Sequence, residues 1–208
     1  MQYTNHHMNL MQFFEGYVRN YRRLNLHGGH NKSMFTQREI DYFAKLGELL
    51  GFDCFVEDSK FDKGKNRSRP MDLSWWKWDQ RIDKENYHYL SLHLERESLW
   101  KKDEGTIEKL FSETEEGYVP HHVIAIQFVE SKERIPYLNR LVREKNEQQQ
   151  SNVLMIYRFL DDENGLENVW AYHIQPNNVE CVRKAVCMKD QMDYWLMCFE
   201  EEKVEVYS

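Results

Sequence analysis

The segment 87–97 constrains the fold most strongly, because apolar and polar side chains alternate along it. Successive side chains of a strand point to opposite faces, so this segment predicts a strand with one apolar and one polar face. The apolar face carries Leu90, Leu92 and Leu94, and the polar face carries Ser91, His93, Glu95 and Glu97. A second segment, 122–129, is largely apolar, which is typical of a strand covered on both faces. We therefore expect a sheet that is covered by other elements.

The rest of the chain switches between helix-like and strand-like patterns. Apolar residues spaced three and four apart predict helices over 8–24, 36–50 and 134–149. Residues 103–116 and 177–200 are also predicted to be helical. Short apolar or alternating runs predict strands over 53–60, 70–78, 87–97, 122–129, 153–160 and 169–174. This order predicts one α/β domain with a mixed central sheet flanked by helices. Its parts are a helical extension over 1–34, a core over 35–175 and a C-terminal helical extension over 176–208.

Composition narrows the class of protein. The 208 residues are 41% hydrophobic and 14% aromatic, which is enough for a packed core and argues against disorder. The net charge of −7 is unlike that of a dedicated nucleic-acid binder, so any nucleic acid should meet a restricted surface. The four cysteines form no CxxC pair, which argues against a zinc ribbon. No signal-like start and no long apolar run occur, so we expect a cytoplasmic protein without a membrane span.

Three acidic residues give the strongest chemical indication. Glu95 and Glu97 are two residues apart on one predicted strand, so their side chains leave the same face. Asp72 lies near the start of the preceding strand, and a short turn would make the two strands antiparallel neighbours, with facing Cβ atoms about 5 Å apart. Carboxylates that close favour a bound cation, and Mg²⁺ or Mn²⁺ takes oxygen ligands. The alternative is that these acids line the solvated face of a hairpin.

The segments Pro70-Met71-Asp72 and Leu94-Glu95-Arg96-Glu97-Ser98 resemble the motif of the PD-(D/E)xK nuclease superfamily. The predicted order of a helix, a three-strand meander, a helix and a strand, over roughly 35–130, resembles its core. The resemblance implies a restriction-endonuclease-like fold that hydrolyses phosphodiester bonds. It also implies catalytic roles for Asp72, Glu95 and Glu97. Asp72, Glu95 and the carbonyl of Arg96 would bind Mg²⁺ or Mn²⁺.

The third motif position departs from the family, because Glu97 stands where Lys is usual. A lysine from elsewhere could replace it, and Lys77 and Lys101 are the candidates that we name. Glu39 matches a helix acid that some members add to the metal site. The run Thr36-Gln-Arg-Glu39 is also a capping box, which would explain Glu39 without a metal.

Two further polar residues could face the acids. His93 could act as a general base near the metal, or it could be a structural histidine. Gln127 lies on the covered strand that follows the meander, where several family members have a polar residue.

A basic loop precedes Asp72, and its charged residues are Lys60, Lys63, Lys65, Arg67 and Arg69. These residues could hold a phosphate backbone beside the metal, or they could form an ordinary solvated loop. The tryptophans at 75, 76 and 78 could stack on bases, but core packing is the favoured interpretation.

The sequence thus predicts hydrolysis of nucleic acid, DNA in the first instance, with Mg²⁺ or Mn²⁺. One alternative is a nuclease-like domain that has lost catalysis and serves as a protein-interaction or scaffold module, which the missing motif Lys and the acidic net charge favour. Another is a protein that binds DNA without cutting it. The choice between DNA and RNA and the oligomeric state are left open.

Overall fold

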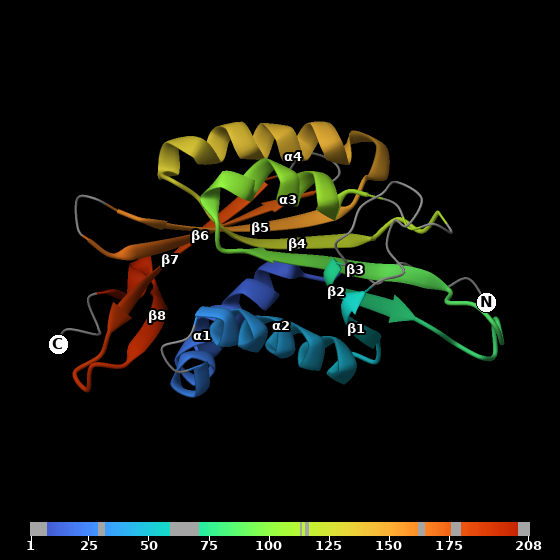
Figure 1. The fold of residues 1–208 in the computed structure, drawn as a ribbon, viewed down its shortest axis with the longest axis horizontal. Coiled ribbons are helices and arrows are strands. Elements are labelled where there is room, and N and C mark those ends of the chain that lie inside the picture. The colour runs from blue at the N-terminus through green and yellow to red at the C-terminus, as the bar shows by residue number, and fades with distance from the viewer. Residues whose placement is uncertain are drawn as a thin grey trace.

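The structure, a computed structural model, describes residues 8–28, 32–58, 71–112, 114, 117–161, 165–175 and 180–203. Within these residues eight strands form one mixed sheet, and helices cover both of its faces (Figure 1). The α/β class and the mixed sheet are confirmed. The strands are β1 (Asp53–Asp58), β2 (Met71–Lys77), β3 (Tyr89–Glu97), β4 (His122–Phe128), β5 (Asn152–Leu160), β6 (Glu167–Ile174), β7 (Glu180–Lys189) and β8 (Trp195–Phe199).

The described helices are α1 (Leu10–Gly28), α2 (Lys32–Leu49), α3 (Asp103–Leu110) and α4 (Ile135–Gln149). Short 3₁₀ turns are η2 (Trp100–Lys102), η3 (Lys132–Arg134) and η4 (Glu200–Glu202). None of the helices in these ranges is both long enough and apolar enough to cross a membrane.

The strands follow one another across the sheet in chain order. The pairs β3–β4 and β4–β5 are parallel, and the other neighbouring pairs are antiparallel. A parallel pair needs a crossover connection, and α3 and α4 lie in these two crossovers. Both crossovers advance in the same direction and are expected to be right-handed, which places both helices on one face of the sheet. Figure 1 shows α3 and α4 on that face and α1 and α2 on the other.

The alternation along β3 divides its side chains between two cores. Leu92 and Leu94 pack in the cluster that contains the apolar residues of α1 and α2. The residues between them, such as His93 and Glu95, point toward the layer of α3 and α4. On the neighbouring strand, Ala125 packs in the second cluster, which contains apolar residues of α3 and α4. The acidic positions of β3 therefore face a layer that is itself covered.

The predicted C-terminal helix over 177–200 is wrong, because residues 180–189 form the strand β7 and residues 195–199 form the strand β8. Alternate side chains serve different clusters here: Ala185 packs with α1, whereas Val186 packs in a separate cluster on the other face. A turn joins the two strands, in which Asp193 has a φ of 64° and Asp190 Oδ1 accepts the Met192 N–H at 2.8 Å. Aspartate tolerates the left-handed region and builds such turns. The C-terminal helical extension is thus a hairpin over the described residues.

Candidate functional site

The structure brings Asp72 and Glu95 together across β2 and β3. The antiparallel register pairs Leu73 with Leu94. Asp72, which precedes Leu73, therefore lies opposite Glu95, which follows Leu94. The Asp72 N–H donates to Glu95 Oε1 at 2.9 Å, and the Arg96 N–H donates to Asp72 Oδ2 at 2.8 Å. Each carboxylate is therefore fixed by the backbone of the opposite strand.

Lys109 of α3 contacts this pair, and sequence reasoning missed it. Its Nζ lies 2.5 Å from Glu95 Oε1, and its side chain is 17% exposed. The two lysines named from the sequence lie elsewhere. Lys77 donates to the Gly51 carbonyl at 2.8 Å, and Lys101 lies 5.2 Å from the centroid of the Trp100 ring. The signal that points to Lys109 is the crossover geometry, which puts α3 over the polar face of β3.

Burial shapes the acid–base properties of the two carboxylates. Desolvation, and after it the charge of Asp72, raise the pKa of Glu95 to about 7 against the opposing effect of Lys109. Desolvation also raises the pKa of Asp72, and the N–H of Arg96 opposes that shift. Ionising Glu95 is thus costly in the folded protein, and a nearby cation would offset this cost.

This pKa shift predicts a specific pH dependence of stability. Because the folded-state pKa of Glu95 is raised, its contribution is fully present below about pH 4.3 and is lost as the pH rises through about 7. Glu95→Gln cannot ionise, so its stability relative to wild type should improve by about 2–3 kcal/mol from pH 5 to pH 8. Urea unfolding of both proteins in EDTA measures this change.

His93 gives the pH experiment an internal comparison. Desolvation lowers its pKa to about 4, so its contribution is present above about pH 6.5 and is lost as the pH falls through 4. The two residues have opposite effects below neutral pH. The Glu95→Gln variant should therefore lose stability more steeply than wild type on acidification. Parallel pH profiles for the two proteins would contradict the shifted pKa of Glu95.

Glu97 and Gln127 face each other across the parallel pair β3–β4. Glu97 Oε1 accepts the Leu99 N–H at 2.9 Å, and the charge of Glu97 raises the pKa of Asp72. Gln127 is fully buried, and neither atom of its amide has a hydrogen-bond partner within the described residues. A buried amide without a partner is costly and is kept where water, an ion or a ligand satisfies it. Gln127 is thus an additional candidate oxygen donor.

His93 lies beneath α3 rather than at an open site. It is 1% exposed, and its Nδ1 lies 3.5 Å from the Leu110 carbonyl oxygen. This burial favours the structural alternative for His93 over the general base.

Glu39 lies on the opposite face of the sheet from Glu95 and Glu97. Its Oε2 accepts from Arg96 Nε at 2.7 Å, and Arg96 alternates with the two acids along β3. The predicted capping box is wrong, because α2 begins at Lys32 and both Thr36 and Glu39 lie inside the helix. The charged partners of Glu39 are therefore the guanidinium groups of Arg96 and Arg158. Glu39 is neither a helix cap nor a member of the acidic pair.

Other predicted groups have separate outcomes. The basic residues Lys60, Lys63, Lys65, Arg67 and Arg69 lie outside the described residues. Trp75 and Trp76 are buried in the core, which confirms the packing interpretation for them, whereas Trp78 is 40% exposed.

The donor set at the acidic site consists of oxygen atoms. Among the described residues, no group of three or more His, Cys, Asp and Glu side chains is arranged to hold a metal ion. Two carboxylates remain, Asp72 and Glu95, and on the same face lies the amide of Gln127, which has no hydrogen-bond partner in the part of the chain that the structure describes. Mg²⁺ keeps several waters and needs only one or two carboxylates, whereas zinc prefers nitrogen and sulfur ligands. The residues present therefore fit Mg²⁺ or Mn²⁺ in their chemistry.

Comparisons with known proteins leave the family open. No protein-family model matches the chain, and a comparison with curated proteins finds no match. Among solved structures, the central domain of yeast acetyl-CoA carboxylase matches 80% of this chain and 26% of that chain, at 8% identity and a TM-score of 0.43. The chain thus spans about a quarter of that protein's length. A likeness at this level carries no argument about function.

Proposed function

We propose that this protein hydrolyses phosphodiester bonds of nucleic acid with Mg²⁺ or Mn²⁺ held by Asp72 and Glu95. The observation that carries the proposal is the pairing of these two carboxylates across β2 and β3 with Lys109 in contact. The order α2, β1–β2–β3, α3, β4 supports the restriction-endonuclease-like part of the proposal, because it repeats the order that the resemblance implies.

Each residue has a distinct role in this proposal. Asp72 and Glu95 hold the cation, with the Arg96 carbonyl as a further ligand. The bound metal supplies Lewis acidity at a phosphoryl oxygen. Lys109 stabilises the negative charge that develops on the phosphate oxygens, because its ammonium already lies against Glu95. Glu97 positions the attacking water.

One observation favours the alternative of a nuclease-like domain without catalysis. Both carboxylates already have protein partners: Glu95 accepts from Lys109 and from the Asp72 N–H, and Asp72 accepts from the Arg96 N–H. A charged pair that is satisfied in this way can persist without a metal. The alternative predicts no divalent-ion binding at Asp72 and a role in protein interaction or scaffolding.

Calorimetric titration with Mn²⁺ tests the proposal directly. We expect wild type to bind Mn²⁺ and Asp72→Asn to lose this binding, because the variant removes one of two ligand charges. The substitution should preserve the fold, since the amide oxygen of Asn can still accept the Arg96 N–H. Cleavage of DNA and RNA panels should then require Mn²⁺ or Mg²⁺ and stop in EDTA.

Asp193→Asn is the matched control. Asp193 lies in the turn between β7 and β8 with a left-handed backbone that Asn also tolerates, and its side chain is 79% exposed. This variant should bind Mn²⁺ like wild type. Absence of binding in wild type would favour the non-catalytic alternative, and cleavage that persists in EDTA would exclude the proposed mechanism.

A further inference from the structure

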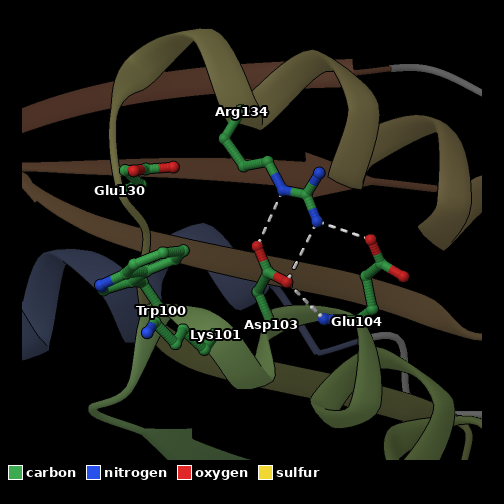
Figure 2. Close-up of a pocket in the computed structure, with 6 residues that line it drawn as sticks. All are labelled: Trp100, Lys101, Asp103, Glu104, Glu130 and Arg134. Atoms are coloured by element: carbon green, nitrogen blue, oxygen red, sulfur yellow. Dashed lines mark hydrogen bonds and ion pairs between the residues drawn. The ribbon is translucent and has the colours of Figure 1, made fainter.

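A hollow of about 480 Å³ lies where the chain leaves the carboxyl ends of β3 and β4 (Figure 2). It is lined by Trp100, Lys101, Asp103, Glu104, Glu130 and Arg134. Its volume falls within the range of about 300–1,000 Å³ that small-molecule sites occupy. Ligands of open α/β sheets commonly bind outside the carboxyl ends of the strands. The hollow therefore has the size and the position of a ligand site.

The hollow adjoins the acidic site through the segment that follows β3. Glu97 Oε1 accepts the Leu99 N–H at 2.9 Å, and Lys102 Nζ lies 3.9 Å from Glu97 Oε2. Trp100 lies between these two residues in the chain and lines the hollow. The acidic site and the hollow thus both lie toward the carboxyl end of β3.

One wall of the hollow is held rigidly by ion pairs. Arg134 Nε donates to Asp103 Oδ2 at 2.9 Å, and Arg134 Nη2 donates to Glu104 Oε1 at 2.6 Å (Figure 2). The same guanidinium lies 4.4 Å from the centroid of the Tyr137 ring. One guanidinium against two carboxylates leaves this wall with a single surplus negative charge, and the contacts order its side chains before a ligand binds.

Besides this wall, the hollow presents the Trp100 indole, the Glu130 carboxylate and the Lys101 ammonium, which lies 5.2 Å from the centroid of the Trp100 ring. Trp100 is 40% exposed. Glu130 is exposed and makes no hydrogen bond or ion pair with another residue in the described ranges. In the view of Figure 2, Glu130 lies above the indole and Lys101 below it. The site thus combines an aromatic surface, an acceptor and a donor.

The charge of the lining selects among the parts of a nucleotide. Three carboxylates stand against two cations in the hollow, so a phosphate group would be repelled. A nucleobase is flat and uncharged, and its amino groups can donate to a carboxylate. Stacking on an aromatic side chain is open to every base, but only when the base is free of its duplex partner.

We propose that the hollow binds one nucleobase of a single-stranded nucleic acid, stacked on Trp100, with the adjoining phosphate at the acidic site. This inference rests on the proposed function, because it assumes that the acidic site receives the backbone. Glu130 accepts from the amino group of the base, and the Arg134 wall limits how far the base enters.

Fluorescence anisotropy with labelled DNA and RNA single strands of about ten nucleotides tests the inference. The acidic site needs a cation to receive a phosphate, so the measurement is made with Ca²⁺, which also takes oxygen ligands. The length of the strand is checked on a gel afterwards, so that binding is separated from cleavage. We expect Trp100→Ala to weaken binding about tenfold and Trp100→Phe to keep most of the affinity, because a phenyl ring still stacks. An abasic strand of the same length should bind wild type as weakly as the normal strand binds Trp100→Ala.

Trp195→Ala is the matched control. Trp195 is 45% exposed, and it lies on the edge strand β8, several strands away from β3 and β4, beside which the hollow lies. It should bind like wild type. Equal binding by wild type and Trp100→Ala, equal binding of normal and abasic strands, tighter binding of duplex, or no binding by wild type would each overturn the inference. Cleavage that survives such a result would leave the proposed function standing. Binding that depends on Trp100, without cleavage in Mn²⁺, would support the base site and contradict the proposed hydrolysis.

Discussion

Replacing Lys109 by Gln is expected to lower metal-dependent cleavage by about 100- to 1,000-fold, the usual effect of removing one group that stabilises transition-state charge. The same change should strengthen Mn²⁺ binding. Lys109 Nζ lies 2.5 Å from Glu95 Oε1, so it competes with a cation for that carboxylate. The two readouts move in opposite directions, which a simple loss of folding cannot produce. Single-turnover cleavage and calorimetry measure them separately.

Lys145→Gln is the control for this experiment. Lys145 lies on α4, and its Nζ lies 3.6 Å from a carboxylate oxygen of Glu108, so the variant makes the same change of charge away from Glu95. It should leave both readouts near their wild-type values. Unchanged cleavage in Lys109→Gln would remove Lys109 from the mechanism. Tighter Mn²⁺ binding without cleavage in either protein would keep the metal site and contradict the proposed hydrolysis.

The part of the site that follows from local pattern could be predicted from the sequence. Alternation along β3 places Glu95 and Glu97 on one face. A connection too short for a crossover makes β2 the antiparallel neighbour of β3, which brings Asp72 to Glu95. These inferences depend only on the period of a strand and on the length of a turn.

Lys109 could not be found in the same way, because its position depends on where a helix lies rather than on strand period. The crossover from β3 to β4 sets the place of α3, and only then does Lys109 reach Glu95. The predicted capping box at Glu39 is wrong for a related reason, because a capping pattern takes account only of residues close together in the sequence. Burial against two arginines from distant strands overrides that pattern.

The C-terminal hairpin was misassigned because its apolar residues fit two periods. Val182, Ala185 and Val186 have the spacings of three and four that are typical of a helix. These residues form a strand rather than a helix because they pair with β6, in which Val182 lies opposite Tyr172 and Val186 lies opposite Asn168. Strand preference depends on such neighbours more than helix preference does.

Glu39→Gln is expected to lower the free energy of unfolding by about 3–5 kcal/mol, the usual cost of removing one member of a buried ion pair. Glu39 is fully buried and its carboxylate serves two cations. Oε1 accepts from Arg158 Nη1 at 2.9 Å, and Oε2 accepts from Arg96 Nε at 2.7 Å. The hydroxyl of Tyr17 also donates to Oε1. A neutral amide leaves the largely buried guanidinium of Arg96 without this carboxylate, and it leaves the buried Arg158 with the carboxylate of Glu167 alone.

Glu15→Gln is the matched control, measured with Glu39→Gln by urea unfolding at pH 7. Glu15 of α1 pairs with Arg183 at 3.0 Å, but the two side chains are 45% and 30% exposed. An exposed pair contributes about 0–1 kcal/mol, so this variant should unfold close to wild type. Glu39→Gln should also keep its Mn²⁺ affinity at temperatures where it is folded, because Glu39 faces away from Asp72. Loss of Mn²⁺ binding in folded Glu39→Gln would instead show that Glu39 contributes to the metal site. Arg96 would then be the link, because its side chain contacts Glu39 and its N–H donates to Asp72.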